Sequence, residues 1–287
     1  MKYFGFFVGL SLIIFGVFIH SEKTSARDLP KAYAPLPPEL SEIEVEKSNQ
    51  KKPEEPVTIE SIKVPIFIYH SVRPHIPDES YSQDAYDITP ELLEKELLYL
   101  KNNGYTTVGP NDLESYLKSG TTSPVEKPVI LSFDDGWRNQ YTYAFPLLKK
   151  YGLTAIFYIY TNPIDNNSPH FLTWDMVKEM QKAGMLIGSH TLTHPLFREI
   201  DVKEAKKEIS NSKRILEKEL GIKIDAFASP FGLTNGTIEE LIKEAGYKTA
   251  RTTLRGVFHN KDSIYHLSGI LVDDSFENFV AELKRSR

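Results

Sequence analysis

The chain has 287 residues, of which 40% are hydrophobic, a formal net charge of -5 and no cysteine. This length and apolar content suffice for one large core or two small ones. The charge balance argues against a nucleic-acid-binding protein, because no surplus of Lys and Arg exists to neutralise phosphates. The absence of cysteine excludes disulfides, thiolate ligands and a lipid-modified cysteine anchor, so a bound metal must be held by His, Asp or Glu.

The first 20 residues are expected to form a signal sequence or a membrane anchor. After Lys2, residues 3–19 carry no charge and are rich in Phe, Ile, Val and Leu. This stretch is just long enough to cross a bilayer core, and it also suits the core of a secretory signal. Because residues 24–26 form only a passable cleavage site, an uncleaved anchor is favoured over a secreted product. The long hydrophilic remainder is expected to be extracytoplasmic.

Residues 21–61 have the composition of a flexible linker. Pro, Glu, Lys and Ser dominate this segment, and its apolar residues are too scattered to form a core. The folded domain is therefore expected to span residues 62–287.

Within that domain, short apolar runs alternate with amphipathic segments. The predicted strands lie at residues 64–69, 105–108, 129–133, 155–160, 185–188, 226–228, 248–252 and 266–272. The predicted helices lie at residues 90–103, 111–118, 141–151, 174–183, 201–220, 237–245 and 276–284. Strands alternating with helices predict a parallel sheet with helical crossovers. About seven such units favour an α/β fold with a closed or nearly closed barrel.

Several predicted helices begin with recognisable caps. Thr89 precedes the first of them, and Asp201 with Glu204 resembles a capping box at the start of the longest. The inward face of that longest helix is expected to begin at Val202. Thr237 is predicted to cap the helix that follows it.

Candidate functional residues follow four of the predicted strands. His70 follows the first, Asp134 and Asp135 follow the third, His190 follows the fifth with His194 four residues later, and Ser229–Phe231 follow the sixth. Each group alone has an ordinary explanation, since Asp-Asp-Gly suits a turn and two His residues can share a helical face. Functional side chains of parallel barrels gather at the carboxyl ends of strands. Together the groups predict a shared divalent cation, because buried strand ends rarely accept several ionisable side chains without one.

The two adjacent carboxylates are expected to have different roles. Neighbouring residues of a strand point to opposite sides, so both face one site only if the chain turns there, which Gly136 permits. One carboxylate would ligate the metal and stay ionised, while the other accepts a proton from the attacking water. Two His and one Asp leave open positions on a Zn²⁺-like ion, which hydrolysis requires.

Three segments, Ser132–Gly136, Ser189–Pro195 and Ala228–Gly232, resemble motifs of the polysaccharide deacetylases, the NodB homology domain of carbohydrate esterase family 4. The resemblance runs from about Pro65 to the end of the chain. Tyr69–His70 is similar to the opening strand of a subgroup, several members of which act on cell-surface glycans. The resemblance implies a distorted (β/α)7 barrel and metal-dependent removal of N-acetyl groups from a polymer that contains N-acetylglucosamine, such as peptidoglycan, a chitin-like polymer or poly-N-acetylglucosamine.

The resemblance also implies roles for individual residues. Asp134 corresponds to the catalytic base, and Asp135, His190 and His194 correspond to the ligands of a divalent metal, with Zn²⁺ the expected ion. Phe231 corresponds to the residue that lines the substrate groove and offers its backbone N–H to the oxyanion.

The chain departs from the resemblance at three places, one of which is the fourth motif, whose Asp and Trp are not evident near residues 251–253. Ala228 occupies the position of an Arg that pairs with the base; Arg251 on another strand is a candidate replacement, with a structural role equally open. The last motif also lacks its His, which leaves His70 and His266 as candidates for the general acid. His70 is favoured because it follows its strand and because a His titrates near neutral pH.

Substrate contacts are predicted at Pro230, Phe231, Trp137 and Arg251. Trp137 and Trp174 are candidates for an aromatic surface in a sugar site, although either residue could serve only in packing.

Other functions remain open at this point. The same metal centre could remove acetyl esters from xylan or deamidate small cyclic amides, and a barrel without activity could act as a tethered glycan-binding protein. Retention of all three ligands and of the base argues against a pure binder. No Gly-rich phosphate loop supports a kinase or phosphatase, and no protein partner can be inferred from the sequence.

Overall fold

The computed structural model describes residues 61–76, 86–120 and 125–286. All of them lie in the second of the two units into which the chain divides, Glu54–Arg287. The predicted anchor (1–20) and all but the last residue of the predicted linker (21–61) fall outside the described residues and stay predictions. Within the described ranges, no helix combines the length and the apolar character needed to cross a membrane.

Seven parallel strands close into a barrel, which confirms the predicted fold class. Their order around the ring is β2, β12, β10, β9, β8, β7 and β6, and β6 pairs with β2 to complete it. The strands are β2 (Ile66–Tyr69), β6 (Pro128–Phe133), β7 (Ile156–Ile159), β8 (Leu186–Ser189), β9 (Ala226–Ala228), β10 (Thr249–Arg255) and β12 (Leu267–Leu271).

Short strands add to this ring without belonging to it. The strand β5 (Thr106–Thr107) pairs with β6 outside the closed barrel. Two further pairs are β1 (Ile62–Lys63) with β11 (Phe258–His259), antiparallel, and β3 (Ser71–Val72) with β4 (Asp87–Ile88), parallel.

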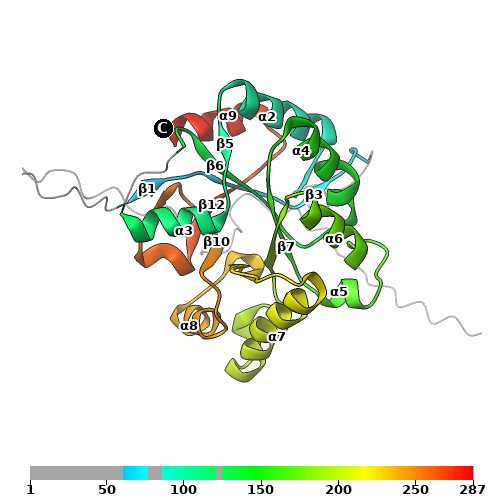
Figure 1. The fold of residues 1–287 in the computed structure, drawn as a ribbon, viewed down its shortest axis with the longest axis vertical. Helices are drawn as coiled ribbons and strands as arrows, with labels where there is room; N and C mark the ends of the chain where they lie inside the picture. Colours follow the sequence, from blue (N-terminus) through cyan, green and yellow to red (C-terminus); the bar gives the residue numbers. More distant parts are fainter. Residues whose placement is uncertain (1–60, 77–85, 121–124, 287) are drawn as a thin grey trace, which may run out of the picture. The chain divides into compact units, whose positions relative to one another are not determined.

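Helices surround the strands (Figure 1). They are α2 (Pro90–Asn102), α3 (Pro110–Ser119), α4 (Phe145–Tyr151), α5 (Asn162–Asp165), α6 (Trp174–Lys182), α7 (Val202–Leu220), α8 (Gly236–Glu244) and α9 (Phe276–Arg285). The predicted helix at 141–151 differs in detail, because a π-helical turn, Gln140–Ala144, precedes α4. Pro146 explains the widened turn, since it has no N–H to donate to the carbonyl four residues earlier and its ring crowds that carbonyl.

One end of the barrel is closed by α3. Leu113 and Leu117 of this helix belong to the same buried cluster as Ile66, Ile156 and Leu267, which are the first residues of their strands. Apolar side chains of α3 therefore pack against the first residues of these strands at the amino-terminal end of the barrel. The polar residues that follow the strands lie at the opposite, carboxyl end.

Two predicted caps are present, but one expectation about the inward face of α7 is wrong. The Thr89 hydroxyl accepts a hydrogen bond from the Leu92 N–H at 3.1 Å, and an Asp201 carboxylate oxygen accepts one from the Glu204 N–H at 2.8 Å. Val202, expected to face inward, is 56% exposed. It is the first residue of α7, at the end of the helix, where the inward stripe has not yet reached the core.

The predicted cap of α8 is also wrong. The Asn235 side-chain oxygen accepts a hydrogen bond from the Ile238 N–H at 3.0 Å, and α8 begins at Gly236, one residue before the predicted cap Thr237. Asn and Thr both suit the cap position, so composition alone did not distinguish them.

We expect Asn235→Ala to lower the free energy of unfolding by about 1 kcal/mol, because it removes the acceptor for an otherwise unpaired helical N–H. Thr237→Ala is the matched control and should change the stability by less than about 0.5 kcal/mol. Urea denaturation followed by circular dichroism measures both values. A larger loss for Thr237→Ala than for Asn235→Ala would contradict the observed cap.

Candidate functional site

Three ionisable side chains converge at the carboxyl end of the barrel. One ligand atom from each of Asp135, His190 and His194 lies within 4.8 Å of the other two. The Asp135 Oδ1 atom is 3.6 Å from His190 Nε2 and 3.5 Å from His194 Nε2. Asp135 follows β6 and the two His residues follow β8. These two strands lie on either side of β7 in the parallel sheet, which brings the two sequence motifs together at one end of the barrel.

The chain turns sharply as it leaves β6. Asp135 and Gly136 both have a φ of 73°, in the left-handed region. The predicted turn therefore starts at Asp135 itself, a residue type that tolerates this conformation better than most. The Trp137 indole N–H donates to Asp135 Oδ2 at 3.0 Å, and the indole ring stacks on Phe171 with centroids 4.5 Å apart. In this structure Trp137 orients a candidate ligand and packs against a neighbouring ring.

Both imidazoles are set up to bind a cation. His190 Nδ1 lies 2.7 Å from the Ala228 carbonyl oxygen, which can only accept, so Nδ1 carries the proton and Nε2 keeps its lone pair. Burial lowers the pKa of His190, although Asp134 and Asp135 oppose that effect. Burial and the neighbouring His190 lower the pKa of His194 to about 4. Both rings are thus neutral near pH 7, the state in which imidazole ligates metals.

Arg251 holds the second carboxylate. Its Nη2 atom lies 2.5 Å from each Asp134 side-chain oxygen, and the two residues are 1% and 2% exposed. Burial alone would raise the pKa of Asp134, but Arg251, followed by His190 and His70, leaves that pKa below its ordinary value. Asp134 is therefore an ionised carboxylate close to the three candidate ligands.

The position of Arg251 corrects one expectation and explains a missing residue. Arg251 lies within β10, where it is the register partner of Ala228 on β9. Its burial removes it from the predicted set of substrate contacts. Its guanidinium instead reaches the carboxylate that the resemblance would pair with an arginine at position 228.

The two candidate acids are far from equivalent. His70 Nε2 is 3.9 Å from Asp134 Oδ2, and the His70 side chain is 18% exposed. His266 precedes β12, and its Nδ1 lies 3.3 Å from Glu239 Oε2. The structure places His70 beside the carboxylate and leaves His266 at the start of a strand.

The remaining predicted contacts differ in exposure. Phe231 is 51% exposed, and its ring centroid lies 4.6 Å from that of His194. Pro230 is buried, so it shapes the 3₁₀ turn Pro230–Gly232 and offers no surface to a substrate. Trp174 donates its indole N–H to Asp165 Oδ1 at 3.0 Å.

Sequence reasoning missed one buried residue of this region, Glu208 on α7. It is 4% exposed and accepts hydrogen bonds from the turn between His190 and His194. A signal was available, because Glu208 lies three residues after Ala205 and next to Ile209 on the inward face of the helix. A charged residue on such a face needs a polar partner.

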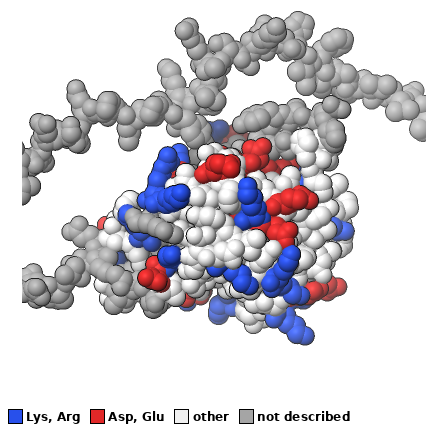
Figure 2. Space-filling model, turned by 90° about the horizontal axis from the view of Figure 1, so that it is seen from above, with Lys and Arg blue, Asp and Glu red and all other residues white. Residues whose placement is uncertain are grey.

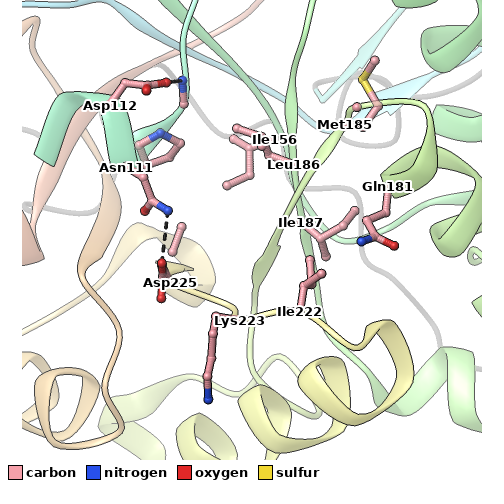
Figure 3. Close-up of a pocket in the computed structure, with 14 residues that line it drawn as sticks. Asn111, Asp112, Ile156, Gln181, Met185, Leu186, Ile187, Ile222, Lys223 and Asp225 are labelled. Atoms are coloured by element: carbon pink, nitrogen blue, oxygen red, sulfur yellow. Dashed lines mark hydrogen bonds between the residues drawn. The ribbon is translucent and has the colours of Figure 1, made fainter. Parts of the chain in front are cut away.

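A separate cavity of about 390 Å³ lies at the other end of the barrel (Figure 3). Ile156, Leu186 and Ala226 line it at the start of β7, β8 and β9, and Asn111 donates to Asp225 at its edge. This cavity is distinct from the Asp and His cluster, which follows the ends of strands.

On the face shown in Figure 2, Lys and Arg side chains are interspersed with Asp and Glu.

Comparison with known proteins places the chain among relatives of one kind. The family described as polysaccharide deacetylase matches residues 121–250. The Bacillus subtilis (strain 168) protein YxkH, whose name assigns it to the polysaccharide deacetylases, is 27% identical over 88% of this chain and 86% of its own length. A poly-beta-1,6-N-acetyl-D-glucosamine N-deacetylase of Staphylococcus aureus (strain MSSA476) is 27% identical over 68% of this chain and 71% of its own.

A solved structure extends the likeness to the fold. The deacetylase PplD of Streptococcus pyogenes, solved in complex with acetate, superposes with a TM-score of 0.73 and 28% sequence identity. The match covers 77% of this chain and 98% of that one.

We expect the protein to bind Zn²⁺ through the Asp135, His190 and His194 cluster. His190→Ala should weaken Zn²⁺ binding by more than about 100-fold, because loss of only an outer partner of a metal site already costs about 10- to 100-fold. His266→Ala is the control and should leave the affinity unchanged, because that ring contacts Glu239 instead. Competition with a chromophoric chelator measures the affinities, and wild-type binding by His190→Ala would rule out this ligand set.

Proposed function

We propose that the chain, which is similar to polysaccharide deacetylases over most of its length, is a member of that family and hydrolyses N-acetyl groups of a cell-surface polysaccharide with the help of a divalent metal. The observation that carries the proposal is the convergence of Asp135, His190 and His194 beside the ionised Asp134. Neutral imidazoles and one carboxylate fit a Zn²⁺-like ion and leave positions open for other ligands. Such an ion, when bound, supplies Lewis acidity and lowers the pKa of water, so that the water loses a proton and becomes a nucleophile near neutral pH.

The residues of the chain then divide the remaining work. Asp134 removes a proton from the attacking water, and the charge-assisted pair with Arg251 keeps its carboxylate ionised and fixed in orientation. His70, which follows the neighbouring strand β2, is the candidate to protonate the departing amine. The Phe231 N–H is the candidate donor to the oxyanion, at an exposed turn next to His194.

We propose a polymer of N-acetylglucosamine as the substrate. The support comes from the Staphylococcus aureus relative, whose name specifies N-deacetylation of such a polymer. The exposed ring of Phe231 beside the cluster suits contact with the apolar face of a sugar. The location that we propose is extracytoplasmic, at the cell wall, either membrane-anchored through residues 1–20 or secreted after cleavage there.

Two other activities share the same centre and are separated by their products. An acetylxylan esterase would release acetate from an ester, whereas a deamidase would release ammonia. A glycan-binding barrel without activity would retain the sugar and release neither product. The ionised base and three converging ligands argue against this last function.

We expect the protein to release acetate from N-acetylglucosamine oligomers or peptidoglycan, and a chelator should stop the release. Asp134→Asn should bind Zn²⁺ as wild type does and lose activity by about 10²- to 10⁴-fold, the usual contribution of a positioned general base. Acetylxylan is the comparison substrate, and acetate and ammonia are both quantified. An active Asp134→Asn protein would reject this residue as the base, and ammonia without acetate would reject deacetylation.

We also expect an arginine at position 228, on the neighbouring strand β9, to replace Arg251 as the partner of Asp134. Arg251→Ala should lower kcat, because Asp134 loses the partner that holds it ionised. The double variant Ala228→Arg/Arg251→Ala should recover part of that loss, since positions 228 and 251 are register partners. Steady-state kinetics test both, with circular dichroism confirming the fold. A folded double variant no more active than Arg251→Ala would contradict this.

A further inference from the structure

The turn that carries the two His residues has a backbone its own sequence does not favour. Thr191 has a φ of 73° and His194 a φ of 59°. A left-handed conformation costs an L-residue about 1–2 kcal/mol, and a β-branched residue such as Thr rarely adopts it. No glycine lies between Thr191 and His194 to relieve the cost. The surroundings must therefore impose the shape of the turn.

One side of the turn is bonded to the segment after β7. The Thr161 N–H donates to the Thr191 carbonyl at 3.2 Å, and the Asn162 N–H donates to the Leu192 carbonyl at 2.9 Å. Within the turn, the Thr191 hydroxyl accepts from the His194 N–H at 3.0 Å. These bonds use carbonyl and hydroxyl acceptors of the turn and leave other N–H groups to be satisfied.

The other side of the turn is bonded to the helix α7, through the side chain of Glu208. Its Oε2 atom accepts from the Leu192 and Thr193 N–H groups, each at 2.9 Å. Its Oε1 atom accepts from the Thr193 hydroxyl at 2.8 Å. A buried carboxylate is costly unless it is well hydrogen-bonded, and bonds to an ionised acceptor are the strong ones. Three such bonds converge from two consecutive residues of the turn.

We propose that Glu208 is a positioning residue of the metal centre: by binding the Leu192 N–H together with the N–H and hydroxyl of Thr193, it holds the strained turn that aims His190 and His194 at Asp135. The proposal rests on the proposed function only in taking these three side chains as a metal site. Glu208 does not touch the candidate ligand atoms, so its effect passes through the backbone of the turn. Loss of Glu208 is therefore expected to lower the metal affinity directly, and to lower the activity only as a consequence.

A second polar contact of α7 provides the matched control. The Ser189 hydroxyl donates to the Ser212 hydroxyl at 2.8 Å, and both residues are fully buried. Ser212 lies one helical turn after Glu208 and contacts β8 itself, before the turn begins. Loss of this bond loosens the docking of α7 on β8 without removing any bond to residues 191–194.

The conservative variant Glu208→Gln separates the effect of the three hydrogen bonds from the effect of the negative charge. An amide oxygen can accept from the two N–H groups, and the amide nitrogen can donate to the Thr193 hydroxyl, which also accepts. All three bonds then survive without the negative charge, whereas Glu208→Ala removes them all. Thr193→Val removes only the bond from the hydroxyl.

The experiment is Zn²⁺ titration against a chromophoric chelator, with thermal unfolding of each metal-free protein alongside. We expect Glu208→Ala to weaken Zn²⁺ binding by about 10- to 100-fold, the usual effect of losing an outer partner of a metal site. Glu208→Gln should recover most of the affinity, and Thr193→Val should show a smaller loss. Ser212→Ala should lower the unfolding temperature with little change in affinity. The absorption of bound Co²⁺ should change in Glu208→Ala and stay unchanged in Ser212→Ala.

The outcomes separate this proposal from the proposed function. Wild-type Zn²⁺ affinity in folded Glu208→Ala overturns the positioning role, and so does an equal affinity loss in Ser212→Ala. If Glu208→Ala does not fold, Thr193→Val decides, and an unchanged affinity there overturns the role. A protein that binds Zn²⁺ as expected but releases no acetate overturns the proposed function and leaves the role of Glu208 standing.

Discussion

The pairing of β2 with β6 is the contact on which the candidate site depends, because it joins the two edges of what would otherwise be an open sheet. Tyr69 lies opposite Phe133, so the residues that follow them leave the barrel at the same level. His70 and Asp134 consequently come within 3.9 Å of each other. In an open sheet of the same strand order, five strands would separate β2 from β6. Closure therefore decides whether the candidate acid His70 and the candidate base Asp134 lie close enough to act on one substrate.

The same end of the barrel concentrates unfavourable backbone. Among the described non-glycine residues with positive φ, Asp135, Thr191, His194 and Phe231 all belong to the candidate site, and Asn167 does not. Each of these four residues follows a strand, and the turn from Thr191 to His194 is bonded to the segment after β7 and to Glu208 of α7. Local preference would relax these turns, so the convergence of the ligands depends on the packed barrel beneath them. The rigid strands and the helix α7 thus position atoms that the short motifs alone could not position.

The difference between local and distant contacts explains how far the sequence predicted the structure. The metal-ligand candidates followed from polar residues placed directly after apolar runs, because strand ends of a parallel barrel meet at one end. The contact between Arg251 and Asp134 joins residues 117 positions apart. The sequence offered Arg251 only as a candidate for it, with a structural role equally open, and the register of β9 with β10 places Arg251 beside position 228. Glu208 was missed because its partners are backbone N–H groups of a turn whose shape no local pattern specifies. The metal dependence, the polymer and the membrane anchor stay predictions.

The burial of Arg251 bears on why this ion pair exists. Its guanidinium lies 5.2 Å from the ring of Tyr158 inside the barrel, and its Nε has no hydrogen-bond partner among the described residues. A buried ion pair with an incompletely satisfied cation is a poor source of stability, because desolvation offsets much of the attraction. What the pair does supply is an ionised carboxylate in a place where burial alone would favour protonation. The general base that we propose needs that state, so the burial of this ion pair supports the proposed role of Asp134 more than a role in folding.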